Sequence, residues 1–305
     1  MKGLELSKRY FEEFGKPMLE REFGDKLSRM AVGLVGHGSE CFGFDDEVSL
    51  DHDYEAGFCI WLTRKDEEEF GFKLFRAYSK LPKEYGGVKM QQKSTFGSPY
   101  KGIHTIEEFY SFYLGEKFPK TNREWLAIPD FYLAEATNGE VFFDNLGEFT
   151  KVRNEIKNRP QDVRLKKLAS SLFYMAQAGQ YNYIRCSKHG ESLAAAYALN
   201  SFVDNCANAI FLINDKFAPY YKWKFKALKN LDKLSSVYGE LSKLQSEPYN
   251  YDKNVALIEA ISDKIIEALI SFGLSENRGD YLEAYANAVN NNIKDGEIRN
   301  LAIML

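Results

Sequence analysis

Two aspartates separated by one residue are the strongest candidates for chemistry in this chain. Asp51 and Asp53 stand shortly before an apolar run, residues 57–62, which predicts a β-strand. If the pair opens that strand, both side chains point to the same face, with Cα atoms about 6.5–7 Å apart. Two carboxylates in this arrangement can bind one divalent cation, and hard oxygen ligands suit Mg²⁺. A structural role is the alternative, because short acids often close loops by capping backbone amides.

A glycine-rich turn precedes the two aspartates. Gly36, Gly38 and Gly43 follow a second apolar run, residues 31–35, and lead into an acidic loop. Glycine permits positive φ angles and close approach of a ligand to the backbone, and free amides in such a turn can hold phosphate oxygens. The pattern therefore predicts a strand, a turn, a loop and a second strand, with a phosphate-binding turn beside a metal-binding pair. In the loop, Ser49 can either orient a carboxylate or cap the backbone locally.

The elements that position these residues belong to a chain long enough for two domains. Its 305 residues exceed the size at which a single core stops growing, and 45% hydrophobic with 28% charged residues is typical of a globular protein. Strand signals stop near residue 150, and helical periodicity continues from there to residue 305. We expect an α+β protein, with a mixed β-sheet and helices in residues 1–150 and an all-α helical bundle in residues 151–305.

Charge and hydropathy exclude several classes of protein. No apolar run approaches the roughly 18–20 residues that span a bilayer, and no secretory signal pattern begins the chain. The four cysteines lack the close spacing of zinc or redox motifs, which indicates buried free thiols. We therefore expect a cytoplasmic protein with no membrane partner. The net charge of −4 argues against a protein that coats nucleic acid, although residues 216–233 hold six lysines and one aspartate.

A hairpin is predicted around Asn138 and Gly139. This dipeptide lies between apolar stretches at residues 131–136 and 141–143, and Asn-Gly is a strong signal for a two-residue hairpin turn. The hairpin would place Glu135 on a strand that extends the sheet.

The spacing of these motifs resembles the nucleotidyltransferase superfamily, typified by DNA polymerase β and the aminoglycoside nucleotidyltransferases. That superfamily carries a Gly-Gly or Gly-Ser pair after its first strand and Asp-x-Asp or Asp-x-Glu at the start of the second. Here Gly38-Ser39 is followed by eleven residues and then by Asp51-x-Asp53. A wider similarity reaches an uncharacterised bacterial branch of the superfamily. It rests on the segments Asn138-Gly-Glu-Val-Phe-Phe-Asp144, Gln177-Ala-Gly-Gln-Tyr-Asn-Tyr183 and Ala218-Pro-Tyr-Tyr-Lys-Trp223.

The resemblance implies transfer of a nucleoside monophosphate from a nucleoside triphosphate (NTP), such as ATP, to an acceptor hydroxyl, with release of pyrophosphate. Gly38 and Ser39 would hold the triphosphate, assisted by Ser49, and Asp51 and Asp53 would bind two Mg²⁺ ions. These ligands suit the chemistry because phosphoryl transfer depends mainly on positioning and charge neutralisation.

The sequence departs from the family pattern at the third carboxylate, which a later strand normally supplies and which helps to activate the acceptor hydroxyl. The strand expected at residues 101–105 contains no acid. Glu135 is the first substitute and Asp144 the second, and the absence of a third acid is the remaining alternative. His52, between the aspartates, occupies a position that is usually apolar in the family.

Aromatic and polar residues in the helical half are candidates for substrate contacts. The segment at residues 220–223 joins stacking rings with the cation of Lys222, which suits a contact with the nucleotide or a clamp on the acceptor. Packing between domains is the alternative. Gln177, Gln180 and Asn182 stand beside an apolar stripe and are candidates for lining the acceptor pocket.

The sequence thus predicts a magnesium-dependent nucleotidyltransferase. Residues 1–150 would form the catalytic domain, and residues 151–305 would bind the acceptor, which can be a small molecule, an RNA end or a protein side chain. The competing hypothesis is a nucleotide- or RNA-binding regulatory protein that has lost catalysis. The base preference and the oligomeric state stay open.

Overall fold

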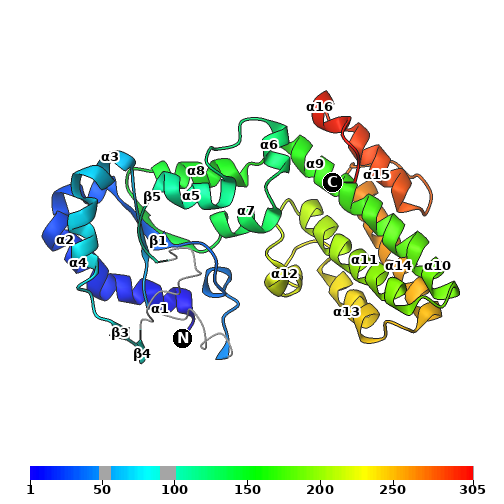
Figure 1. Cartoon of the computed structure of the whole chain (residues 1–305), viewed down its shortest axis with the longest axis horizontal. Helices are drawn as coiled ribbons and strands as arrows, with labels where there is room; N and C mark the ends of the chain where they lie inside the picture. The colour runs from blue at the N-terminus through cyan, green and yellow to red at the C-terminus, as the bar shows by residue number, and fades with distance from the viewer. Residues whose placement is uncertain (48–55, 90–100, 305) are drawn as a thin grey trace. The chain divides into compact units, whose positions relative to one another are not determined.

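A computed structural model describes residues 1–47, 56–89 and 101–304 of the chain, which form two compact units (Figure 1). The predicted class is confirmed, because the fold is α+β with a small mixed sheet and a helical C-terminal region. The change of pattern near residue 150 falls inside a helix of unit 1, and the catalytic and acceptor-binding roles of the two halves stay predictions. Unit 1 consists of Met1–Phe118 and Tyr132–Asn158, and unit 2 of Pro119–Phe131 and Arg159–Leu305.

Unit 1 is built on a four-stranded mixed β-sheet. Its strands are β1 (Ala31–Leu34), β2 (Cys59–Leu62), β5 (Gly102–Thr105) and β6 (Glu140–Asp144), and a separate hairpin joins β3 (Glu84–Tyr85) to β4 (Val88–Lys89). The strand order is β5-β2-β1-β6. β1 runs antiparallel to β2 and β6, whereas β5 runs parallel to β2. The two strands predicted on either side of the glycine-rich turn are therefore present as β1 and β2.

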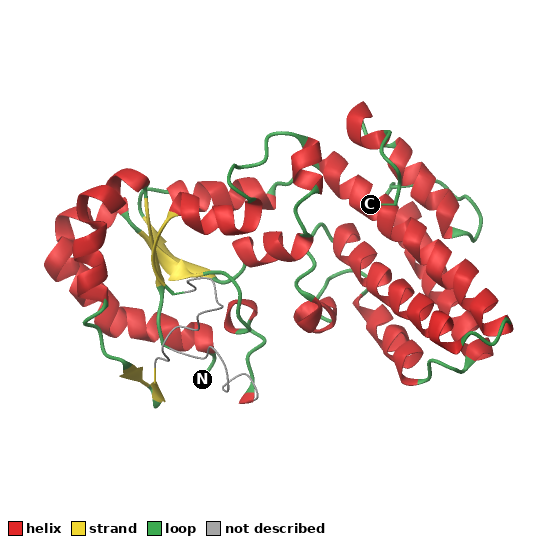
Figure 2. Cartoon of the chain, viewed as in Figure 1, coloured by secondary structure: helices red, strands yellow, loops and turns green. Residues whose placement is uncertain are grey.

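Helices cover both faces of this sheet (Figure 2). Successive residues of β2 point to opposite faces: Ile60 joins an apolar cluster with the N-terminal helices, whereas Trp61 stacks on Phe149, with ring centroids 3.9 Å apart. Burial on both faces explains why β1 and β2 are continuous apolar runs. The helices and helical turns are α1 (Gly3–Tyr10), η1 (Phe11–Gly15), α2 (Lys16–Phe23), η2 (Gly24–Arg29), η3 (Glu40–Phe42), α3 (Arg64–Asp66), η5 (Glu67–Gly71), α4 (Phe72–Tyr78), α5 (Ile106–Leu114), α7 (Asp130–Thr137) and α8 (Glu148–Lys157).

The hairpin predicted around Asn138 is wrong in its first arm. Residues 131–136 belong to the helix α7, and β6 pairs with β1 instead. The first arm is rich in leucine and alanine, which are strong helix formers, and its buried residues Leu133, Ala134 and Ala136 do not alternate as a half-buried strand would. Gly139, with φ +62°, follows the end of this helix, where left-handed glycine is common.

Helices are the regular elements among the described residues of unit 2. α9 packs against α11 and α15, and the buried amine of Lys166 on α9 donates to Asn290 Oδ1 at 2.9 Å and to the carbonyl oxygen of Leu301 at 2.8 Å. Within the described part of the chain, no helix is both long enough and apolar enough to cross a bilayer. The elements are α6 (Asn122–Leu126), α9 (Gln161–Met175), η6 (Ala176–Tyr183), α10 (Ile184–Lys188), α11 (Ser192–Ile213), α12 (Tyr221–Leu228), η7 (Ser235–Val237), α13 (Tyr238–Ser246), α14 (Tyr251–Ser271), α15 (Leu282–Asn291) and α16 (Gly296–Arg299).

Candidate functional site

The ends of four strands meet at one edge of the sheet in unit 1. β1 ends at Leu34, opposite Glu140 at the start of β6. Cys59, the first residue of β2, pairs with Gly33 of β1 and with Gly102 at the start of β5. The described residues just after β1 therefore lie at the same edge of the sheet as those just before β2, β5 and β6.

The predicted glycine turn (residues 36–39) follows β1 at this edge. Gly36 and Gly38 have φ angles of 131° and 126°, which side chains with a Cβ rarely adopt. The carbonyl oxygen of Ser39 accepts hydrogen bonds from the backbone N–H of Phe42 at 3.2 Å and of Phe44 at 2.9 Å, which closes the chain into η3. Gly38 and Ser39 are half-buried, so part of each residue is open to solvent.

Asn138 and Gly139 hold the glycine turn from the side of β6. The side-chain amide of Asn138 accepts from the N–H of Gly36 at 2.9 Å and donates to its carbonyl oxygen at 2.7 Å. The N–H of Gly139 donates to the carbonyl oxygen of Cys41 at 2.9 Å. The Asn-Gly signal in the sequence thus marks a clamp on the glycine turn, a role that sequence reasoning missed.

A buried ion pair lies beside the turn. Glu40 Oε1 and Lys101 Nζ are 3.3 Å apart, and both side chains are about 95% buried. Lys101 directly precedes β5, the strand expected at residues 101–105. Burial is the main cause that raises the pKa of the Cys59 thiol to about 12, and the nearby lysine acts in the opposite direction. No local pattern in the sequence predicts this pair, because its two residues are far apart along the chain.

Glu135, the first substitute for the third carboxylate, lies on α7 rather than on a strand. It is half-buried, and burial raises the pKa of its carboxyl to about 7. Burial is the main cause that raises the pKa of Tyr113 on α5, and the negative charge of Glu135 raises it further. A hydrogen bond with the backbone of His37 lowers this pKa. Tyr113 is thus a neighbour of both Glu135 and the glycine turn.

Asp144, the second substitute, caps a helix. Its two carboxylate oxygens accept from the backbone N–H of Gly147 and of Thr150, each at 2.8 Å, at the start of α8. It pairs with Ala31, the first residue of β1, so it lies at the opposite end of the sheet from the glycine turn. The two hydrogen bonds of Asp144 and its place in the sheet therefore give this residue a structural role as a helix cap.

The structure tests the implied Mg²⁺ site only in part. Asp51, Asp53 and Ser49 fall outside the described residues. Within residues 1–47, 56–89 and 101–304, no group of three His, Cys, Asp or Glu side chains is placed to hold an ion.

A separate cavity of about 570 Å³ lies in unit 2. It is bounded by residues 126–131, by α9, by α11 and by residues 218–224. Lys222 does not line it, since its side chain is exposed and its Nζ lies 5.2 Å from the ring centroid of Trp223. Gln180 does not line it either, because it donates to Glu259 at 2.8 Å and holds η6 to α14.

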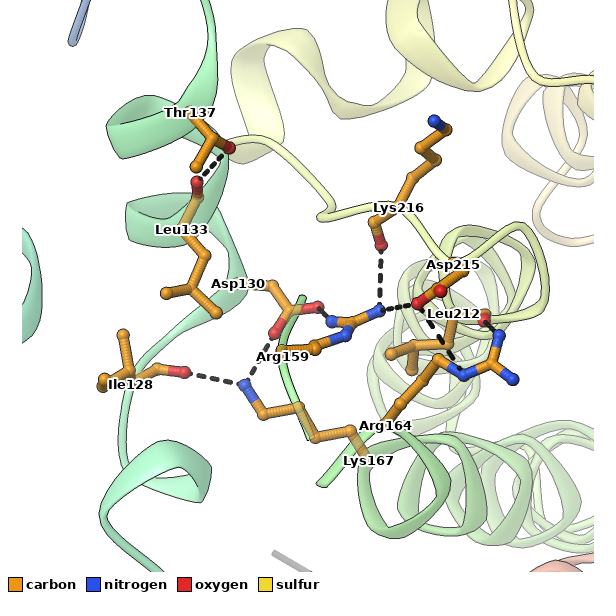
Figure 3. Close-up of polar contacts among 10 residues, drawn as sticks. All are labelled: Ile128, Asp130, Leu133, Thr137, Arg159, Arg164, Lys167, Leu212, Asp215 and Lys216. Atoms are coloured by element: carbon orange, nitrogen blue, oxygen red, sulfur yellow. Dashed lines mark hydrogen bonds and ion pairs between the residues drawn. The ribbon is translucent and has the colours of Figure 1, made fainter. Parts of the chain in front are cut away.

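An ionic network supports the wall of this cavity (Figure 3). The guanidinium of Arg159 donates to Asp130 Oδ2 at 3.1 Å and to Asp215 Oδ1 at 3.4 Å. Lys167 Nζ donates to Asp130 Oδ1 at 2.6 Å and to the carbonyl oxygen of Ile128 at 2.7 Å. The network ties the segment before α7, the start of α9 and the loop after α11 to one another.

Residues 125–224 match a protein family described as a domain of unknown function, DUF4037. Every residue that lines the cavity of unit 2 falls within the matched span, as does Glu135, whereas the glycine turn and the two aspartates lie before it. No curated protein matches the chain.

Proposed function

We propose that the protein is a magnesium-dependent nucleotidyltransferase that transfers a nucleoside monophosphate from an NTP to an acceptor hydroxyl. The observation that carries the proposal is the glycine turn at the end of β1, followed along the chain by Asp51-x-Asp53 and then by β2. Because β1 and β2 are antiparallel neighbours, the chain comes back into the sheet at the same edge as the turn. A glycine turn at the sheet edge, with an acidic pair next along the chain to bind Mg²⁺, suits a charged triphosphate.

In this proposal, the backbone amides of Gly38 and Ser39 hold the triphosphate, and Asp51 and Asp53 are the ligands of Mg²⁺. When bound, Mg²⁺ supplies neutralisation of the charge on the phosphate oxygens. The acceptor oxygen forms a bond to the α-phosphorus, and the bond from that phosphorus to the bridging oxygen of the β-phosphate breaks. Pyrophosphate leaves with that oxygen, and the proton of the acceptor hydroxyl passes to a base.

Glu135 is the base in this proposal. A general base works best when its pKa lies near the working pH, and burial raises the pKa of Glu135 to about 7. It is charged above that pH and can then accept a proton. The rate of transfer should therefore rise as the pH passes through about 7 and then level off.

A cytoplasmic location is part of the proposal. Cys41, Cys59, Cys186 and Cys206 are free cysteines in the structure, and free thiols are typical of reducing compartments.

The test is release of pyrophosphate by the full chain with Mg²⁺, each of the four NTPs, and panels of small-molecule, RNA and protein acceptors. Asp51→Asn and Asp53→Asn should abolish release, and Glu135→Gln should lower it by about 10²–10⁴-fold. Glu47→Gln is the matched control, because Glu47 is an exposed acid of the same loop. Release that is equal in the wild type and both aspartate variants contradicts the proposal. Saturable NTP binding without release across all panels favours the regulatory alternative.

A further inference from the structure

We infer that the cavity of unit 2 is a binding site for an uncharged ring compound that carries several hydroxyl groups. The role of this compound as the acceptor rests on the proposed function, but its binding does not. The cavity volume of about 570 Å³ falls in the range of small-molecule sites. Its walls come from four stretches of a single unit, so the site is complete within unit 2.

The charges that line the cavity are paired with one another. Lys224 Nζ lies 2.8 Å from Asp204 Oδ1, and Lys167 Nζ lies 2.6 Å from Asp130 Oδ1. These four residues are the charged members of the lining, and their formal charges cancel. A phosphate group bound to either lysine would bring its negative charge close to the paired acid, which disfavours a nucleotide as the occupant.

Hydrogen-bond acceptors face this neutral cavity from α11. The side-chain amide nitrogen of Asn205 donates to the carbonyl oxygen of Ser201 at 2.8 Å, and that of Asn208 donates to Asp204 Oδ2 at 3.3 Å. Each amide uses one N–H within the helix, so its carbonyl oxygen and its second N–H are the groups that a ligand can contact. Asp204 adds a half-exposed carboxylate. A ligand that matches these groups carries donors such as hydroxyls.

Aromatic rings form another part of the lining. Tyr220 and Tyr221 have ring centroids 4.4 Å apart, and Phe131 lies 5.7 Å from Tyr220. Both tyrosines are substantially exposed, at 43% and 65%. Rings with an apolar face and a polar rim suit the flat side of a ring compound whose edge is hydroxylated.

The site is held in shape before any ligand arrives. Arg159, with only 2% of its side chain exposed, fixes Asp130, and Lys167 fixes both Asp130 and the backbone of Ile128. A wall fixed by buried charge pairs loses little freedom on binding, which favours affinity for a small ligand.

The experiment measures binding of three uncharged probes to the full chain by saturation-transfer NMR and titration calorimetry. The probes are myo-inositol, glucose and adenosine, which separate a cyclitol, a sugar and a nucleoside as the source of the hydroxylated ring. Inorganic pyrophosphate is the anionic counter-probe. We expect saturable binding of at least one uncharged probe.

Two variants locate that binding in the cavity. Asn208→Ala and Tyr220→Ala should each weaken it by about fivefold or more, since a lost hydrogen bond is worth about 1 kcal/mol and a lost aromatic contact about as much. Asn200→Ala and Tyr197→Ala are the matched controls, because both residues are exposed and lie on α11 outside the cavity. Thermal unfolding of each variant checks that the fold is intact.

Three results would overturn the inference: no saturable binding of any uncharged probe, binding that the cavity variants leave unchanged, or binding of pyrophosphate that the same variants remove. The result is independent of nucleotide transfer. If the proposed function fails, the cavity still binds its probe. If the cavity does not bind the uncharged probes, the cavity variants should still bind NTP through unit 1 as the wild type does.

Discussion

The side-chain amide of Asn138 is hydrogen-bonded to both backbone groups of Gly36, accepting from its N–H at 2.9 Å and donating to its carbonyl oxygen at 2.7 Å. Asn138 lies just before β6, and Gly36 lies just after β1. One side chain therefore fixes the position of the glycine turn relative to the sheet. A turn that is fixed in advance can present its amides to a phosphate without an additional ordering cost.

Asn138→Ala should destabilise unit 1 by about 1–3 kcal/mol, because it leaves the N–H and carbonyl oxygen of buried Gly36 without their partner. Denaturant unfolding measures the change. Asn154→Ala, at an exposed position on α8, is the control and should change the free energy of unfolding by less than about 0.5 kcal/mol. Equal stability of the two variants would show that the clamp contributes nothing.

Gly139→Ala should cost more than Gly147→Ala. Both glycines have positive φ angles, at 62° and 80°, so each substitution carries a conformational penalty of about 1–2 kcal/mol. At Gly139 an added Cβ would also lie 2.0 Å from the carbonyl oxygen of Leu34, whereas at Gly147 it meets nothing within 4 Å. We expect a further loss of at least about 2 kcal/mol for Gly139→Ala, measured by denaturant unfolding. A loss equal to that of Gly147→Ala contradicts the close approach.

Glu135→Gln should stabilise the protein at pH 8 but not at pH 4. The carboxyl has a pKa of about 7 in the folded chain and 4.5 ordinarily, so between these values the folded state holds a proton that the unfolded state has released. The free energy of unfolding therefore falls as the pH rises through this window. After allowance for the exposed part of the side chain, glutamine should gain about 1–2 kcal/mol at pH 8.

Denaturant unfolding at the two pH values, with exposed Glu155→Gln as the control, measures this difference. A stability gain that is the same at pH 4 and pH 8 would show that the carboxyl of Glu135 is not desolvated.

Arg159→Met should destabilise unit 2 by about 1–3 kcal/mol. The substitution removes a buried cation from Asp130, although Lys167 still contacts that carboxylate and Asp215 is open to solvent. Arg123→Met is the matched control, because Arg123 pairs with Glu297 at an exposed site, and it should cost less than about 1 kcal/mol. Thermal unfolding compares them, and equal melting temperatures would contradict a structural role for the network.

Local patterns in the sequence predict much of unit 1 correctly. The apolar runs around the glycine turn form β1 and β2, and the strand expected at residues 101–105 forms β5. The segment at residues 131–136 is different, because a short apolar stretch suits either a helix or a buried strand until its neighbours are known. Tertiary packing decides this case, and it places Glu135 on a helix.

The remaining features of the candidate sites depend on contacts between residues far apart in the sequence. Glu40 and Lys101 pair across 61 positions (101 − 40), and the cavity of unit 2 joins residues 126–131 to residues 218–224. No local pattern predicts such contacts, since they form between residues that are distant along the chain. The Asn-Gly dipeptide was detectable, but its role as a clamp required the position of Gly36.

The central claim is that the glycine turn and the two aspartates bind an NTP together with Mg²⁺. Calorimetric titration of the full chain with ATP, GTP, CTP and UTP, with and without Mg²⁺, tests it directly, using the wild type, the double variant Asp51→Asn/Asp53→Asn and the control Glu47→Gln. We predict saturable binding of at least one NTP that requires Mg²⁺, persists in Glu47→Gln and is lost in the double variant. Binding of equal affinity without Mg²⁺ or in the double variant, or no binding of any NTP, would contradict the claim.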